Sequence, residues 1–165
     1  MRMKKVLFLL VALSLVIGTH CLAIDRSDKL LSLVNLSRET TTKQKVTDML
    51  GQPVKIEENK KRIWWHYING NTNLVICWNK KSDAFENCSF SSTQSEKCVF
   101  DSRLSRKLRS GSTDMLQALT LLGTPVDMKI KGATQEMHYS YQNSVLRLFF
   151  RDRVLVDFTL LGQVK

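Results

Sequence analysis

The chain has 165 residues, of which 43% are hydrophobic and 24% charged, and its formal net charge at pH 7 is +10. This length suits one compact domain or two small ones. The composition is that of a globular chain, and no low-complexity tract is long enough to predict a disordered tail.

Residues 1–23 have the order of a secretory signal peptide. Basic residues at 2, 4 and 5 precede an apolar run from Val6 to Ile17, and small residues favour cleavage after Ala23. The apolar run is shorter than the roughly 20 residues that span a bilayer. The leader carries three of the ten net positive charges, so about +7 would remain after cleavage. We therefore expect a periplasmic or secreted protein.

The cysteines offer two further expectations that follow from export. Cys21 would anchor the chain in a membrane if it were lipidated, although Gly18-Thr19-His20 is a poor match to a lipidation signal. Otherwise we expect no membrane partner. An oxidising compartment favours one disulfide among Cys77, Cys88 and Cys98. A Cys77–Cys88 bond across a hairpin is the preferred pairing, and Cys88 with Cys98 is the alternative.

The chain matches itself at a spacing of 72 residues, the distance from Gly51 to Gly123. Such self-similarity predicts a tandem duplication. The predicted boundaries are a leader at 1–23, a first module at 24–90, a linker at 91–103 and a second module at 104–165. Other matches at this spacing are Leu36 with Leu108, Thr41 with Thr113, Pro53 with Pro125, His66-Tyr67 with His138-Tyr139, and Leu74 with Leu146.

Each copy begins with two helical segments. The first is predicted near Lys29–Leu36 and Leu104–Arg109. Thr41 and Thr113 are then placed as N-caps of the second, with Gln44 completing a capping box in the first copy. Glycines, each followed two residues later by a proline, predict where these helices end. Apolar helical spacing is carried by Val46, Met49 and Leu50, and by Met115, Ala118, Leu119 and Leu122.

An alternation with period two follows each helix and predicts strands. Trp65 and Tyr67 point one way, while Trp64 and His66 point the other. The predicted fold class is therefore α+β: two tandem modules, each a helix-turn-helix packed on a three- to four-stranded antiparallel meander. In the second copy the inward series is Met137 and Tyr139, then Leu146, Leu148 and Phe150, then Val154, Val156, Phe158 and Leu160.

The sequence has only weak motifs for catalysis, metal binding or nucleotide binding. Cys77 and His66 could form a nucleophile pair, but no third residue is marked to orient the histidine. Cys77, Cys88 and Cys98 with a histidine have the ligand types of a zinc site without a close Cys-x-x-Cys pair. No glycine loop indicates a nucleotide. We therefore expect no catalytic residue, no metal, no cofactor and no enzyme.

Two surfaces are candidates for binding. The basic run Arg103, Arg106, Lys107 and Arg109 could meet phosphates or an acidic surface, or could be the solvated side of a helix. Export disfavours nucleic acid as its partner. The sheet face turned away from the helices has the composition of a recognition surface, unless the strand register is displaced by one residue. The predicted partner-binding residues are Trp64, His66, Glu136, His138, Arg147, Phe149 and Arg151.

The repeated motifs resemble a known superfamily. They are Leu50-Gly51-Gln52-Pro53, Trp65-His66-Tyr67 and Leu74-Val75-Ile76-Cys77-Trp78, with their second-copy partners. The pattern is similar to the β-lactamase inhibitor protein and the small outer-membrane assembly lipoproteins of the SmpA/OmlA type. The resemblance implies a long joined sheet that grips a partner protein. The functional hypothesis is an exported, non-enzymatic, inhibitor-like protein-binding module; the alternative is an envelope or outer-membrane assembly factor.

Overall fold

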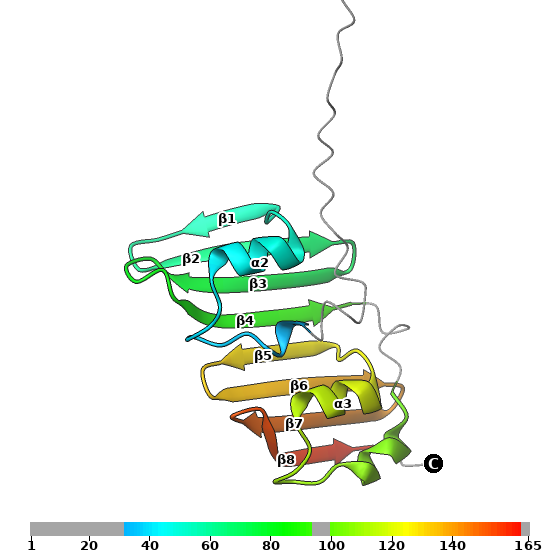
Figure 1. Cartoon of the computed structure of the whole chain (residues 1–165). Helices are drawn as coiled ribbons and strands as arrows, with labels where there is room; N and C mark the ends of the chain where they lie inside the picture. The colour runs from blue at the N-terminus through cyan, green and yellow to red at the C-terminus, as the bar shows by residue number, and fades with distance from the viewer. Residues whose placement is uncertain (1–31, 94–99, 163–165) are drawn as a thin grey trace, which may run out of the picture.

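A computed structural model describes residues 32–93 and 100–162. Its centre is one eight-stranded antiparallel sheet in which every strand pairs with its neighbours in the sequence (Figure 1). The leader, Cys21 and Cys98 lie outside the described residues. The strands are β1 (Lys55–Glu58), β2 (Arg62–Asn69), β3 (Thr72–Asn79), β4 (Phe85–Ser92), β5 (Asp127–Lys131), β6 (Thr134–Tyr141), β7 (Ser144–Arg151) and β8 (Val154–Leu161).

The predicted fold class, two tandem modules that are each a helix-turn-helix packed on an antiparallel meander, is wrong. β4 pairs with β5 from Asn87↔Lys131 to Ser91↔Asp127, which joins all eight strands into one sheet. The helices are short: α2 (Lys43–Leu50) and α3 (Met115–Leu122) have eight residues each, and η1 (Ser102–Lys107) is a 3-10 helix. The chain between η1 and α3 makes a turn at residues 110–112 and also bonds to the edge of β8, through Gly111 N and Thr113 O to Leu155.

Both α-helices begin one residue later than predicted. The side chain of Thr42 accepts from Lys45 N, and that of Asp114 accepts from Gln117 N, so these residues are the N-caps. Thr41 and Thr113 instead accept from the backbone N–H four residues earlier, which fixes the turn before each helix. The capping box belongs to the second helix, through Gln117, and not to Gln44. The predicted helix ends are confirmed, since Gly51 and Gly123 take φ of 81° and 80°.

One hydrophobic core fills the space between the helices and the sheet. Helix residues such as Val46 and Leu119 meet strand residues such as Tyr67 and Met137 there, and all four are buried. Burial of each large apolar side chain stabilises the fold by about 1.5–3 kcal/mol. The segment that contains the buried Leu33 and Leu36 also packs into this core. It touches the second half of the sheet, where Arg153 Nη2 donates to Asn35 O at 3.5 Å.

The two halves repeat several local contacts. The Tyr67 hydroxyl donates to Gly51 O at 3.3 Å, and the Tyr139 hydroxyl donates to Gly123 O at 3.2 Å. The backbone N–H of Val54 donates to His66 O, as that of Val126 donates to His138 O. These bonds tie each helix end to the strand after it. The duplication itself stays a prediction from the sequence.

A bulge displaces β8 from the predicted alternation. The register shifts between Phe149 and Phe150, so Leu155, and not Val156, turns into the core. Leu155 is fully buried whereas Val156 is 48% exposed. A bulge inserts one unpaired residue and so reverses the alternation beyond it. Among residues 32–93 and 100–162, no helix has the length and apolar content needed to cross a membrane.

Candidate partner-binding face

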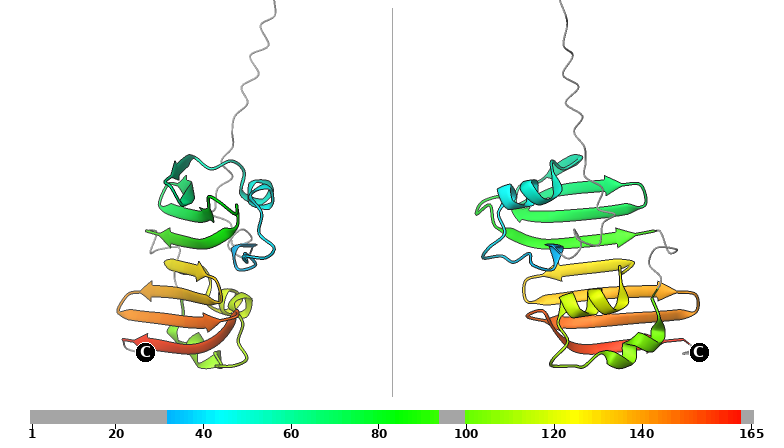
Figure 2. Two further views of the ribbon diagram at one scale, coloured as in Figure 1. Left: turned by 90° about the vertical axis from the view of Figure 1, so that its left-hand side faces the viewer. Right: turned by 45° about the vertical axis from the view of Figure 1, so that its right-hand side comes forward.

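The sheet has one face packed on helices and one face without them, which we call the open face. α2 and α3 lie on the same side of the sheet in every view (Figures 1 and 2). No helix of the described residues covers the other side. Cross-strand pairing places Trp64, His66, Glu136, His138, Arg147, Phe149 and Arg151 together on the open face.

The register explains this placement. Trp65, Tyr67, Met137 and Tyr139 alternate with the seven predicted residues and are buried against the helices. In the second half, His138 lies opposite Arg147 and Glu136 lies opposite Phe149. The structure therefore brings the predicted residues to one face, in a group on β2 and a larger group on β6 and β7. Their role in binding stays a prediction.

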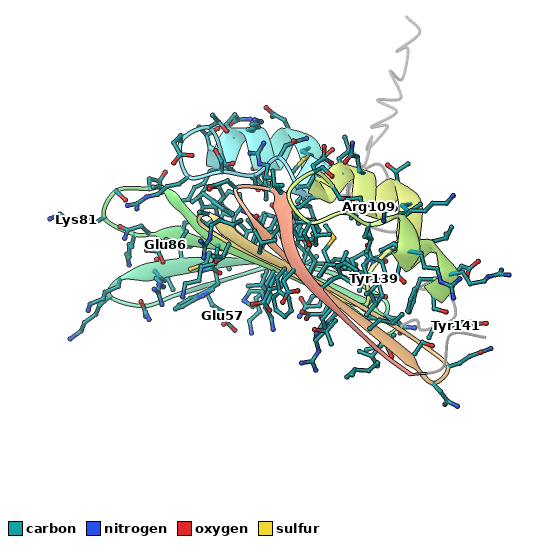
Figure 3. All side chains as sticks on the ribbon, turned by 90° about the horizontal axis from the view of Figure 1, so that it is seen from below. Glu57, Lys81, Glu86, Arg109, Tyr139 and Tyr141 are labelled. Carbon is teal, nitrogen blue, oxygen red and sulfur yellow. The ribbon has the colours of Figure 1, made fainter. Side chains whose placement is uncertain are left out.

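A polar layer surrounds Trp64 and His66 in the first half. β1 adds Glu57, which lies opposite Trp64 and forms an ion pair with Lys55. Figure 3 shows Glu57 on the side away from the helices. The hydrogen bond and charge of Lys55 lower the pKa of Glu57, and His66 adds to this effect. His66 Nε2 lies 3.4 Å from Glu57 Oε2, but without hydrogen-bond geometry.

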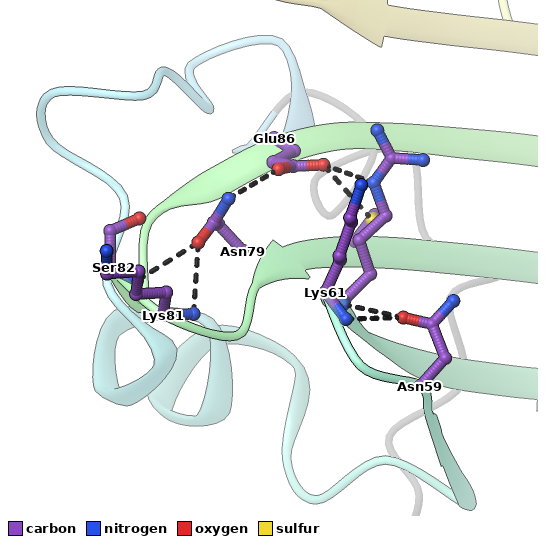
Figure 4. A network of polar contacts seen from close by, with 8 residues as sticks. Asn59, Lys61, Asn79, Lys81, Ser82 and Glu86 are labelled. Atoms are coloured by element: carbon purple, nitrogen blue, oxygen red, sulfur yellow. Dashed lines mark hydrogen bonds and ion pairs between the residues drawn. The ribbon is translucent and has the colours of Figure 1, made fainter.

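A second polar cluster lies where β3 turns into β4 (Figure 4). Glu86 accepts from Asn79 Nδ2 at 2.9 Å and from Arg62 Nε at 2.6 Å. These bonds lower the pKa of Glu86, that of Asn79 contributing most. The Cys77 thiol donates to Glu86 Oε2 at 3.8 Å. The cluster therefore holds a charged carboxylate over a buried thiol.

This arrangement does not support a cysteine nucleophile. Burial first, and the Glu86 charge second, raise the pKa of Cys77, so the unreactive thiol is the favoured form. Its polar contact is Glu86 and not His66. Among the described residues, no group of three His, Cys, Asp or Glu side chains could hold a metal ion.

The predicted Cys77–Cys88 disulfide is wrong. Cys77 lies opposite Asn87 and Cys88 lies opposite Ile76, so the two side chains point to opposite faces of the sheet. Both cysteines are free, and burial raises the pKa of Cys88 to about 12. The prediction placed the hairpin one residue out of register, and a shift of one residue exchanges the faces.

The second half of the open face has a different electrostatic character. Burial lowers the pKa of His138, and the Arg147 charge lowers it further. Lys129 and Asp127, on β5, form an ion pair of 3.6 Å beside these residues. The histidine is thus held neutral among charges of both signs.

Sequence reasoning missed the two short strands that complete the open face. β1 and β5 supply Glu57 and Lys129, which lie next to Trp64 and Glu136. Both strands begin soon after the repeated Pro-Val pair, at residues 53–54 and 125–126. The position after a Pro-Val pair was the available signal for each strand, because the strands themselves are short and rich in charge.

No protein-family model matches the chain. No curated protein matches it by sequence either. Among solved structures, a candidate β-lactamase inhibitor protein from Streptococcus mutans has a TM-score of 0.53 at 14% identity, covering 82% of this chain and 96% of that chain. A DUF4309 family protein, YjgB, from Bacillus subtilis has a TM-score of 0.29 at 13% identity, covering 86% and 98%. The first of these likenesses shows a shared fold, as the sequence resemblance implied.

Proposed function

We propose that the chain is a non-enzymatic protein-binding module that captures its partner on the open face. The observation that carries this proposal is an eight-stranded surface that no helix of the described residues covers. Half-buried aromatic side chains, Trp64 and Phe149, lie within it, and exposed charges surround them. Large aromatic anchors within a charged rim are typical of binding hot spots.

The charges of the open face also suit selective recognition. Lys129, Arg147 and Arg151 are exposed beside Glu136 and Asp157, so both signs are interleaved. Such a surface repels partners whose charges do not match it. Because Cys77 is buried and protonated, it does not support nucleophilic catalysis as an alternative function.

Inhibition is the finer part of the proposal. A partner held on the open face would have part of its own surface covered, and inhibition follows if that part contains its active site. The Streptococcus mutans neighbour is described as a candidate β-lactamase inhibitor protein. A β-lactamase is therefore a suitable first partner to test for lost activity.

Export to the periplasm or the medium is also proposed, on the pattern of residues 1–23. Mass spectrometry of the mature N-terminus tests it. A chain that begins near Ile24 supports a released protein, whereas a lipid on Cys21 supports the alternative of an envelope assembly factor. A chain that keeps Met1 contradicts export by cleavage.

Affinity capture with the protein as bait tests the open face. We expect Trp64→Ala and Phe149→Ala each to lower partner recovery by roughly 30-fold, the loss of a hot spot. Arg147→Glu supplements them, because this exposed side chain can change without disturbing the core. Ile56→Ala is the matched control, since Ile56 is 58% exposed and pairs with Trp65 on the other face.

Circular dichroism would show that each variant is folded before capture. Unchanged recovery by Trp64→Ala, Phe149→Ala and Arg147→Glu together would exclude the open face as the binding site. Equal loss with Ile56→Ala would have the same meaning.

A further inference from the structure

A groove of about 730 Å³ lies on the helix side of the protein, between η1 and α3. Two cations, Lys107 and Arg109, stand beside it with the exposed Leu116. No aspartate or glutamate lines it. Its lining also includes Thr113, Gln117 and Thr120.

Within the part of the chain that the structure describes, no acid pairs with the cations at this groove. Arg103 is paired with Asp101 at 2.8 Å, but no ion pair among the described residues involves Arg106, Lys107 or Arg109. Arg109 Nη1 donates to the carbonyl oxygens of Arg106 and Leu108, which holds its guanidinium at the end of η1. Figure 3 shows Arg109 beside α3. The nearest acid on α3, Asp114, is engaged as the N-cap.

The first half of the chain provides an internal comparison. Ser37 N donates to Thr41 Oγ1 at 2.8 Å, just as Arg109 N donates to Thr113 Oγ1 at 2.8 Å, so the local backbone is the same. Yet position 37 is a serine where position 109 is an arginine. The positions that match Lys107, Leu116 and Thr120 are Asn35, Gln44 and Asp48. The fold therefore does not require cations or an exposed leucine here.

Three side-chain oxygens of the groove are already bonded within the protein. The Thr120 hydroxyl donates to Leu116 O at 2.8 Å, and Gln117 Oε1 accepts from Asp114 N at 2.9 Å. Thr113 Oγ1 is occupied by Arg109 N. What remains for a ligand is positive charge and the apolar surface of Leu116, which is 47% exposed. This combination attracts a ligand that carries negative charge beside apolar groups.

We propose that the η1–α3 groove is a docking site for a membrane surface that carries anionic lipids. Basic side chains are attracted to anionic headgroups, and an adjacent leucine can enter the apolar boundary beneath them. This site would bind a membrane without a lipid on Cys21, whereas the sequence led us to expect membrane binding only through that lipid.

The position of the groove is compatible with partner capture. It lies on the side of the sheet that carries α2 and α3, and the open face is on the other side (Figure 2). A protein docked through η1 and α3 would present the open face away from the membrane. The docking site does not depend on the proposed function, and either can fail alone.

Vesicle co-sedimentation tests the docking site. The protein is obtained by expressing the full chain, including its N-terminal segment. Vesicles of phosphatidylcholine alone are compared with vesicles in which about half of it is replaced by phosphatidylglycerol. We expect binding to the anionic vesicles to exceed binding to the neutral ones and to weaken with salt. Arg106→Gln with Lys107→Gln should lower it roughly 30-fold, about fivefold for each cation lost.

The matched control is Lys60→Gln with Lys61→Gln, which removes the same charge from an exposed turn between β1 and β2. We expect this control to bind like the parent protein. Leu116→Ser should weaken binding without altering its salt dependence. Any contribution of the N-terminal residues to binding is the same in all variants. Equal binding to both vesicles, or equal loss in the control and the η1 variant, would therefore overturn the proposal.

Discussion

The two halves of the sheet share backbone hydrogen bonds but differ in the side chains that form their cores. In the first half, the Trp78 ring packs edge-on against Trp65 at 5.4 Å and Phe85 at 6.1 Å between centroids. In the second half, the corresponding places hold Met137, Phe150 and Leu155, which are also buried. The same strand framework thus accepts an aromatic core and a mainly aliphatic one.

The surfaces of the halves differ in the same way. Lys43 at the start of α2 lies 5.8 Å from the Trp65 ring and pairs with Asp83, whereas its counterpart on α3, Met115, is buried. On the open face, His66 lies opposite Val75, but His138 lies opposite Arg147. The two halves therefore share hydrogen bonds at the helix and strand ends, while side chains at matching positions can be charged or apolar.

The largest expected effect is in the aromatic core. Trp78→Ala should lower the free energy of unfolding by about 3–5 kcal/mol, because it leaves a large cavity. Trp78→Phe, which introduces the residue of the second half, should cost about 1 kcal/mol or less. It loses ring area, but it also removes Trp78 Nε1, a buried donor without a hydrogen-bond partner.

Urea denaturation at neutral pH measures both changes. Phe150→Ala is the comparison, with an expected loss near the lower end of the same range, about 3 kcal/mol. If Trp78→Phe cost as much as Trp78→Ala, the indole would contribute something that the phenyl ring of the second half does not supply, and the two cores would not be interchangeable.

A smaller effect distinguishes the two helix caps. Asp114→Ala should cost about 1–2 kcal/mol, because it removes a 2.7 Å bond to Gln117 N and a negative charge at the helix start. Thr42→Ala should cost about 0.5–1 kcal/mol, since its bond to Lys45 N is 3.2 Å long and has no capping box. Thermal unfolding measures both, and an equal or larger cost for Thr42 would contradict the difference.

The sequence predicted those features that local chemistry decides. A glycine at position 51 or 123 can take positive φ at a helix end, and the following proline prevents the helix from continuing. The alternation in β2 and β6 predicted which side chains face the helices, because one face of the sheet is buried and the other is not. That alternation predicted the face on which each residue lies, and cross-strand pairing brings the residues together there.

Other features depended on pairing between strands, which one sequence does not reveal. Cys77 and Cys88 are symmetric about the hairpin turn, but a bulge after Cys77 alters the register, and they point to opposite faces. All four residues of β1 are exposed, so it has no apolar alternation to detect. A joined sheet was implied by the resemblance, but the strand pattern itself does not predict the β4–β5 pairing that joins the two meanders. The basic run at 103–109 is visible in the sequence, but the groove beside it depends on the packing of η1 against α3.

The smallest expected effect concerns His138 and its cross-strand neighbour. Burial and Arg147 lower its pKa below 6.5, Lys129 acts in the same direction, and Asp127 and Glu136 oppose them. The unfolded chain therefore binds a proton more readily than the folded one. The stability that neutral His138 contributes is complete above the unfolded pKa and is lost as pH falls through the folded pKa.

Arg147→Val, which introduces the residue found opposite His66, should raise the pKa of His138 toward its ordinary value. NMR titration of the ring proton measures the change, and Arg151→Val is the control because Arg151 lies opposite Thr134 on the same strands. The control should leave the pKa of His138 near that of the parent protein. An unchanged pKa in Arg147→Val would mean that burial alone keeps His138 neutral, and that the arginine of the second half serves the surface and not the histidine.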